Sequence, residues 1–191
     1  MARPWAVDEQ GWLTGARRVL SPHCDARPPG AEIEVLIIHS ISLPAGIYGG
    51  PDVERLFTNQ LALEDHPSYS DLKGVRVSAH LFVRRSGEVV QFVPFASRAW
   101  HAGVSRCAGR ERVNDFSIGI ELEGTDRSAF EEAQYQSLIG ASRALVARYP
   151  RITGDGLYGH SDIAPGRKTD PGPYFDWDRY RGAVRAMGAK L

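Results

Sequence analysis

The apolar run Val35–Ile38, which His39 follows directly, is the feature that most constrains the fold of this chain. Short runs rich in β-branched residues are typical of strands that are buried on both faces of a sheet. Helices must then cover both sides of that sheet, which predicts an α/β fold. The end of such a strand delivers His39 to an edge of the sheet, where an imidazole is available for chemistry.

A second segment, residues 116–123, alternates in polarity with the two-residue period of a strand. Its apolar face carries Phe116, Ile118, Ile120 and Leu122. Its opposite face is small and acidic and carries Ser117, Gly119, Glu121 and Glu123. Such a polar face is suited to the floor of a functional site.

Residues 78–93 have the pattern of a β-hairpin. Two strand-like runs, Ser78–Arg85 and Glu88–Val93, flank the dipeptide Ser86-Gly87. Because glycine tolerates the positive φ of a tight turn, we expect a two-residue loop between two antiparallel strands.

Three segments are predicted to be helical. A short helix is expected near Asp52–Thr58. A longer helix is expected after Ser128, which forms a capping-box pattern with Glu131, and its apolar stripe would cover the sheet through Leu138, Ala141, Leu145 and Tyr149. A last helix is expected over Trp177–Ala186 with Asp176 as its N-cap. Between the last two helices, residues 152–174 are rich in Gly and Pro, which predicts an ordered functional loop rather than a regular element.

Composition limits the function classes. The chain has 191 residues, 42% of them hydrophobic, and no repeat or linker divides it, so we expect one domain with a real core. Its formal net charge is +0, so it has no broad basic face for nucleic acid. We also expect no membrane partner and a cytoplasmic location, because neither an apolar leader region nor an apolar run of about 20 residues is evident. Cys24 and Cys107 are expected to be free thiols.

Two histidines and a carboxylate point to a metal. His39 follows a buried strand, and His160 and Asp170 lie in the Gly/Pro-rich stretch. Each histidine alone is more often a hydrogen-bonded structural residue, but together with a carboxylate they form a donor set that Zn²⁺ accepts. Three protein ligands would leave a fourth position open for water, which indicates catalysis rather than a structural role.

The spacing leaves several assignments open. Asp162 lies two residues after His160 and competes with Asp170 as the oxygen ligand. His80 and His101 are further candidate ligands on the same terms. Glu121 and Glu123 share one strand face, so alternation does not decide which of the two would accept a proton.

Several motifs resemble a known family over about residues 11–183. They are Gly11-Trp12-Leu13, Ala16-Arg17-Arg18, Ser21-Pro22-His23, Arg76-Val77-Ser78-Ala79-His80, Arg98-Ala99-Trp100-His101-Ala102-Gly103 and Phe116–Gly124. In these segments the chain resembles bacterial 1,6-anhydro-N-acetylmuramyl-L-alanine amidases of the AmpD type, zinc amidases related to T7-type phage lysozyme and the peptidoglycan recognition proteins. The resemblance implies a single amidase domain over residues 1–191, with a mixed central sheet flanked by helices and a Zn²⁺ site at the sheet edge.

The resemblance also implies roles for individual residues. Carried over position by position, the Zn²⁺ ligands fall on His39, His160 and Asp170, the proton acceptor on Glu121 and the oxyanion-stabilising lysine on Lys168. Asp162, His80 and His101 would then have supporting or structural roles.

Residues for substrate binding are implied in the same way. Arg76 and Arg112 match arginines that bind carboxylates of the peptide, for which a planar guanidinium has the right geometry. Trp100 would stack on an apolar sugar face or fill the rim. Ser40 stands where the family has asparagine, so its shorter hydroxyl would need a bridging water to reach the substrate.

The implied reaction is hydrolysis of the amide between the lactyl group of 1,6-anhydro-N-acetylmuramic acid and L-alanine of the stem peptide, during peptidoglycan recycling. The partner would be this small anhydromuropeptide. Two other functions compete with it: a non-catalytic muropeptide-binding module of the same fold, and a zinc peptidase or deacetylase that uses the same chemistry on another carbonyl.

Overall fold

A computed structural model describes residues 5–186; the remaining residues of the predicted domain, 1–4 and 187–191, lie outside the described part. Within it, six strands form the central sheet in the order β1-β5-β4-β9-β3-β10. Their bounds are Arg17–Arg18 (β1), Val35–Ile41 (β3), Leu81–Val83 (β4), Val89–Gln91 (β5), Ser117–Glu123 (β9) and Leu157–Gly159 (β10). Neighbouring strands are parallel except for β4 and β5, so the sheet is mixed, as predicted.

Strands β3 and β9 form the centre of the sheet. They pair in parallel over seven residues, from Val35 beside Ser117 to Ile41 beside Glu123. Residues 35–39 are all buried, as expected for a strand covered on both faces. Alternation sends Leu36 and Ile38 into the largest core cluster, whereas Ile37 packs on the other side of the sheet.

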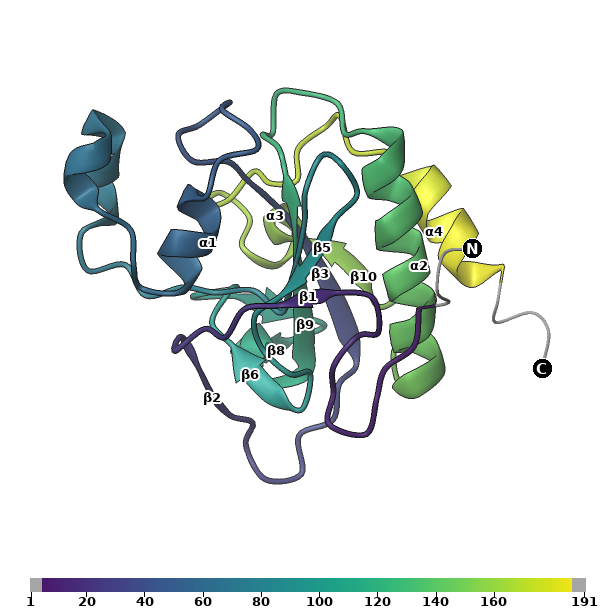
Figure 1. Cartoon of the computed structure of the whole chain (residues 1–191). Helices are drawn as coiled ribbons and strands as arrows, with labels where there is room; N and C mark the ends of the chain where they lie inside the picture. Colours follow the sequence, from purple (N-terminus) through teal and green to yellow (C-terminus); the bar gives the residue numbers. More distant parts are fainter. Residues whose placement is uncertain (1–4, 187–191) are drawn as a thin grey trace.

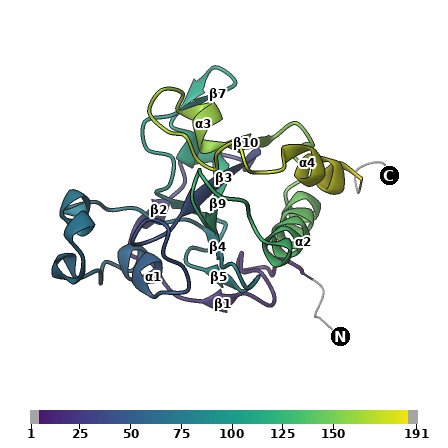
Figure 2. The same ribbon diagram turned by 90° about the horizontal axis from the view of Figure 1, so that it is seen from above.

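Two helices cover one face of the sheet. Figures 1 and 2 show α2 (Glu132–Arg148) and α4 (Trp177–Arg185) side by side on this face. The predicted stripe of α2 faces the core, where Leu138, Ala141 and Leu145 are fully buried. Burying a leucine side chain contributes about 1.5–3 kcal/mol, so this stripe is a main source of stability.

Smaller elements lie on the opposite face. Helix α1 (Asp52–Phe57) packs near β4 and β5, and the short helix α3 (His160–Ile163) follows β10 (Figure 2). Two small antiparallel sheets complete this side, formed by β2 (Cys24–Ala26) with β6 (Ser97–Ala99) and by β7 (Arg106–Cys107) with β8 (Arg110–Glu111). Three short 3₁₀ helices occupy the connections: η1 (Leu63–Asp65), η2 (Pro67–Leu72) and η3 (Val113–Phe116).

Most of the predicted elements are present. Helix α1 begins at Asp52 as expected, and α4 has Asp176 as its N-cap, where the carboxylate accepts a hydrogen bond from the Arg179 amide at 2.9 Å. Both cysteines are free thiols. Among residues 5–186, no helix combines the length and the apolar character that a membrane crossing requires.

The Gly/Pro-rich stretch 152–174 is the main error of the sequence-based prediction. It contains β10, which pairs in parallel with β3, and α3, whose first residue is His160. The strand has only three residues and the helix only four, so neither develops a period long enough to read from the sequence.

The predicted start of α2 at Ser128 is also wrong. The Ser128 hydroxyl lies 3.2 Å from the Tyr48 hydroxyl and 3.1 Å from that of Thr125, so it does not cap the helix. The helix begins at Glu132 instead, with a reciprocal capping box between Glu131 and Gln134.

Two smaller predictions need correction. The hairpin of β4 and β5 exists, but its loop is longer than two residues: the Gly87 amide bonds to the Arg84 carbonyl, the Arg84 amide bonds to the Glu88 carbonyl, and Gly87 has a φ of 85°. The loop therefore has three residues, 85–87, and its last residue is left-handed, which is a common hairpin connection. Phe116 precedes β9 and packs with Ile37 on the face opposite Ile118.

Candidate metal centre and active site

Three side chains converge on the face of β3 opposite α2. His39 lies in β3, two residues before its end, His160 begins α3, and Asp170 lies in the loop after α3. The Nδ1 atoms of the two histidines are 3.0 Å apart. Oδ2 of Asp170 lies 3.2 Å from Nδ1 of His39 and 3.1 Å from Nδ1 of His160. The fold thus brings the three predicted ligands together.

The triangle of these three atoms suits one small cation. Ligand atoms on a tetrahedral Zn²⁺ lie about 3.3 Å apart, because the bonds are about 2.0–2.2 Å long. Nε2 of His160 lies 3.2 Å from the Ala102 carbonyl oxygen, which can only accept a hydrogen bond. In its neutral form the His160 ring therefore carries its hydrogen on Nε2 and turns the Nδ1 lone pair toward His39 and Asp170. A metal ion is a suitable partner for such acceptors.

Other candidate ligands have structural tasks. Oδ2 of Asp162 accepts the Gly159 amide at 2.7 Å at the start of α3, so Asp162 does not join the cluster. Nδ1 of His80 accepts the Gly119 amide at 3.1 Å, and its Nε2 donates to the Ser97 carbonyl at 3.1 Å. Nδ1 of His101 lies 2.9 Å from Nε2 of His39. His101 therefore contacts this candidate ligand at the ring nitrogen that does not face His160.

Burial dominates the electrostatics of these rings. It lowers the pKa of His39 to about 4 and that of His80 to about 3, and it lowers the pKa of His101 well below its usual value. Near neutral pH all three rings are therefore neutral. A neutral imidazole is the form that binds a metal ion.

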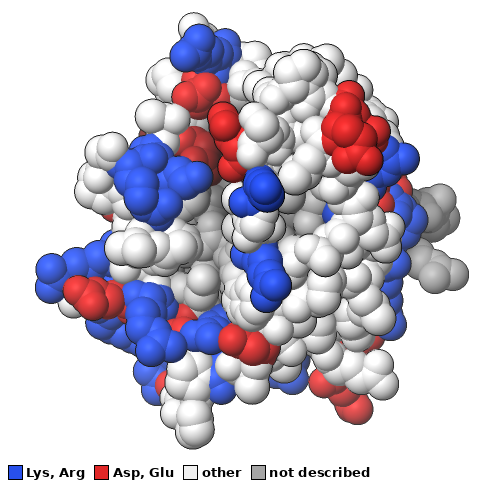
Figure 3. Space-filling view, turned by 90° about the vertical axis from the view of Figure 1, so that its left-hand side faces the viewer, with Lys and Arg blue, Asp and Glu red and all other residues white. Residues whose placement is uncertain are grey.

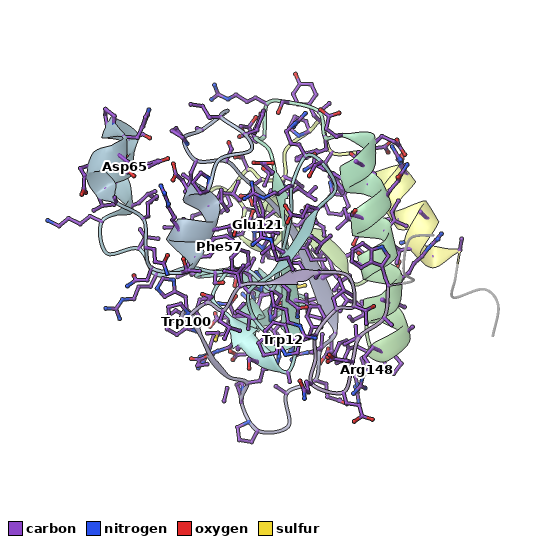
Figure 4. The ribbon with its side chains drawn as sticks, viewed as in Figure 1. Trp12, Phe57, Asp65, Trp100, Glu121 and Arg148 are labelled. Atoms are coloured by element: carbon purple, nitrogen blue, oxygen red, sulfur yellow. The ribbon has the colours of Figure 1, made fainter. Side chains whose placement is uncertain are left out.

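Glu121 lies beside His39 in the pairing of β9 with β3. Its Oε2 atom is buried and has no hydrogen-bond partner within residues 5–186. Burial raises the pKa of this carboxyl well above its usual range, Asp170 raises it further, and Lys168 opposes the shift. Figure 4 shows Glu121 near the middle of the molecule. A half-buried glutamate with such an oxygen, beside a candidate metal site, is suited to proton transfer.

Glu123 has a different environment, although it shares the strand face. It is buried, and its two oxygens accept hydrogen bonds from the Gly49 amide at 2.5 Å and the Arg85 amide at 2.9 Å. Both oxygens of Glu123 thus already accept hydrogen bonds from backbone amides. Because Oε2 of Glu121 accepts none, Glu121 is the better candidate for the proton acceptor.

An open cleft of about 330 Å³ leads to Asp170. Ser40 and the exposed Lys168 line it together with residues of the 41–45 and 124–126 loops. Arg167 lines both this cleft and a larger hollow of about 610 Å³, where Arg112 also lies. Figure 3 shows this side of the molecule, where basic side chains border a hollowed surface.

The four predicted substrate-binding residues are not all in one place. Ser40 and Arg112 border the two adjoining hollows, and Arg112 also contacts Asp115 at 3.2 Å. Arg76 is exposed and lines a separate cavity beside α1 and η2. Trp100, labelled in Figure 4, is half-buried. It stacks on His23, with 6.0 Å between ring centroids.

Sequence reasoning missed the backbone and side chains that support the cluster. The Ala102 carbonyl, the Ser117 hydroxyl and the Asn114 amide contact His160 or His101 across long sequence separations. No spacing rule reports such contacts, although the small residue at Gly119 is a signal: a Cβ there would lie 2.4 Å from the His101 ring.

Comparison with known proteins identifies the family. The model of the N-acetylmuramoyl-L-alanine amidase family matches residues 29–173. The chain is 58% identical over 176 residues to the 1,6-anhydro-N-acetylmuramyl-L-alanine amidase AmpD of Escherichia coli K12, covering 92% of this chain and 96% of that protein. A crystal structure of a selenomethionine derivative of AmpD superimposes with a TM-score of 0.90 at 55% identity, covering 93% of this chain and 98% of the other.

A more distant structure contains a ligand. It is the complex of the N-acetylmuramyl-L-alanine amidase AmiD of E. coli with the substrate anhydro-N-acetylmuramic acid-L-Ala-D-γ-Glu-L-Lys, with a TM-score of 0.59 at 32% identity. It covers 93% of this chain and 65% of the other. From the family match and the high identity over most of its length, this chain belongs to the N-acetylmuramoyl-L-alanine amidase family.

Proposed function

We propose that this chain is a zinc-dependent amidase of peptidoglycan recycling. Its reaction is hydrolysis of the amide between the lactyl group of 1,6-anhydro-N-acetylmuramic acid and L-alanine of the stem peptide. The observation that carries this proposal is the convergence of His39, His160 and Asp170 in a chain that is 58% identical to the 1,6-anhydro-N-acetylmuramyl-L-alanine amidase AmpD of E. coli. A cytoplasmic location stays a prediction, which fractionation of cells would test.

Zn²⁺ is the metal that this donor set fits best, because two imidazoles and one carboxylate are common catalytic zinc ligands. Bound there, Zn²⁺ would polarise the scissile carbonyl and lower the pKa of a water molecule to about 7. His39, His160 and Asp170 would hold it with one charged and two neutral donors, and the open cleft beside Asp170 gives the substrate access.

Glu121 is the proposed proton acceptor. Its free Oε2 is available to take a proton from the attacking water and to pass it to the departing amine. The raised pKa makes this carboxylate a stronger base than an exposed glutamate. A positioned base of this kind contributes roughly 10²- to 10⁴-fold to the rate.

Lys168 is the proposed stabiliser of the oxyanion. It is exposed in the cleft that Asp170 also lines, and its ammonium group can donate to the oxygen on which negative charge develops. Loss of one such donor costs about 2.7–4 kcal/mol in the transition state.

Substrate binding is assigned to the residues at the hollows. Arg112 would bind a carboxylate of the stem peptide, and Ser40 would contact the substrate near the metal, directly or through water. Arg76 and Trp100 stay proposed contacts, although Arg76 lines another cavity.

Product analysis tests the proposal. Anhydromuropeptide is incubated with zinc-loaded protein, and mass spectrometry is used to search for free anhydro-N-acetylmuramic acid and a peptide that begins with L-alanine. Both products are expected, and a chelator should abolish them. Intact substrate that co-elutes with the protein would favour the binding module, and cleavage of an acetyl group or of a peptide bond would favour a deacetylase or a peptidase.

A further inference from the structure

The ring of His101 lies between His39 and Ser117 and contacts both. Its Nδ1 is 2.9 Å from Nε2 of His39, and its Nε2 is 3.0 Å from Oγ of Ser117. All three residues are buried. The ring occupies space that only glycine at position 119 leaves free, since a Cβ there would lie 2.4 Å from Cγ of His101.

These contacts allow two directions for the hydrogen-bond chain. In one, the Ser117 hydroxyl donates to His101, His101 donates to His39, and His39 carries its hydrogen on Nδ1. In the other, Nε2–H of His39 donates to His101, and Nε2–H of His101 donates to Ser117. Only the second direction leaves the Nδ1 lone pair of His39 free toward His160 and Asp170.

Ala102, the residue after His101, determines the tautomer of His160. The Ala102 carbonyl accepts Nε2–H of His160 at 3.2 Å, which leaves Nδ1 of His160 free on the same side. Two groups hold this backbone in place. The Asn114 side chain accepts the amides of His101 and Ala102 at 3.2 and 2.8 Å, and Arg167 donates to the Ala102 carbonyl at 2.7 Å.

We propose that His101, oriented by Ser117, is a positioning residue that holds His39 in the Nε2–H tautomer and so presents Nδ1 to the metal. Together with the Ala102 carbonyl it makes residues 101–102 a single element that fixes the orientation of both ligating histidines. The inference rests on the proposed metal-dependent function of the same site. Groups that orient a ligating histidine typically change metal affinity by 10- to 100-fold when they are removed.

The tautomers are tested directly by long-range ¹H–¹⁵N correlation NMR of the zinc-loaded wild-type protein. The expected result is hydrogen on Nε2 and none on Nδ1 for both His39 and His101. A His101 ring that carries its hydrogen on Nδ1 would overturn the proposal, since it could not accept from His39. This measurement needs no variant and no turnover.

Zinc affinity, measured by competition with a chromophoric chelator, tests the contribution of His101. His101→Leu removes the acceptor and should weaken zinc binding 10- to 100-fold. In His101→Asn the amide oxygen can take the place of Nδ1, so affinity should stay within a few-fold of the wild type. Similar affinities for the leucine variant and the wild type would overturn the proposal, as would equal losses in both variants.

His80→Leu is the matched control, because His80 is also buried but its ring has no hydrogen bond to His39 or His160. It should lose stability and keep its zinc affinity. If His101→Leu does not fold, the zinc affinity of His101→Asn and the NMR spectrum of the wild-type protein still test the proposal. Failure of the wild-type protein to bind zinc would refute the proposed function instead, so the two proposals fail by different results.

Discussion

His39 and Glu121 are direct neighbours in the pairing of the two central strands, β3 and β9. Side chains of paired residues in parallel strands lie on the same face of the sheet, so a candidate ligand and a candidate base start from adjacent backbone positions. The pairing of β3 with β9 therefore sets the distance between the candidate ligand His39 and the candidate base Glu121, whereas a loop supplies Asp170.

Replacement of Glu121 should separate metal binding from catalysis. Glu121→Ala is expected to keep zinc, because Glu121 is not one of the three clustered donors, and to lose turnover by roughly 10²- to 10⁴-fold. Zinc content by elemental analysis and the rate of anhydromuropeptide cleavage measure the two effects. A variant that turns over at the wild-type rate would show that Glu121 is not the base.

Asp170 should be required for metal retention. Asp170→Ala removes one ligand and its negative charge, so the protein should purify with far less than one zinc per chain. Asp162→Ala is the control, because Asp162 caps α3 and should keep its zinc while it loses some stability. Full zinc occupancy in the Asp170 variant, or loss of zinc in the Asp162 variant, would reverse the assignment.

Gly119 should be required for the packing of His101. Gly119→Ala places a methyl group 2.4 Å from the imidazole, and overpacking of this kind typically costs about 1–3 kcal/mol. We expect a lower melting temperature together with weaker zinc binding. Gly182→Ala in α4 is the control: among residues 5–186, no atom outside its chain neighbours and the adjacent helix backbone lies within 4 Å of the new methyl group, so the substitution should leave stability unchanged or raise it.

Local sequence patterns predict residues at the centre of this site but not the residues that surround them. The run Val35–Ile38 and the alternation of 116–123 are local patterns that place His39 and Glu121 on strands of the sheet, although His39 lies two residues before the end of β3 rather than at its end. The choice of Asp170 over Asp162 rests on family resemblance, and the geometry favours it: Asp170 lies with the two histidines, whereas the carboxylate of Asp162 accepts the Gly159 amide.

The rest could not be predicted because it depends on contacts between distant segments. β10 has three residues and is a strand because β3 offers it a free edge. The roles of His101 and Ala102 arise only when their loop meets β3 and α3, which are far away in the sequence. Propensity and periodicity report local preferences, so they do not predict contacts between segments that are far apart in the sequence.

His80 should make the fold sensitive to acid. Burial, with the nearby charge of Arg27, lowers its pKa to about 3, against about 6.5 in the unfolded chain. The unfolded state therefore binds more protons between these values, so the stability present above pH 6.5 is lost as the pH falls toward 3, by at most about 1.4 kcal/mol per pH unit.

Urea unfolding of the metal-free protein between pH 7.5 and 4.5 measures the slope of the whole protein, to which the buried His39 and His101 also contribute. The part due to His80 is the difference between the wild type and a His80 variant. His80→Asn keeps an acceptor for the Gly119 amide and removes the titrating group, so its stability should depend less on pH than that of the wild type. Equal slopes for the two proteins would show that His80 does not titrate on unfolding.

Glu123 should hold the 41–51 loop, which we expect from its Pro and Gly content to act as a lid over the cleft. Its two oxygens each accept one backbone amide, that of Gly49 in the loop and that of Arg85 in the hairpin. In Glu123→Gln only one oxygen remains for two amides, so one of them loses its acceptor. Hydrogen exchange should therefore become faster in peptides that cover residues 42–50 or 84–88.

The same measurement separates anchoring from closure. If the loop is a lid, bound substrate analogue should slow exchange of residues 42–50 in the wild type, because closure protects their amides. Glu64→Gln in η1, outside the loop, is the control and should leave these rates unchanged. Equal rates with and without the analogue would refute the lid. Wild-type exchange in Glu123→Gln would refute the anchor, since an amide that loses its acceptor exchanges more readily.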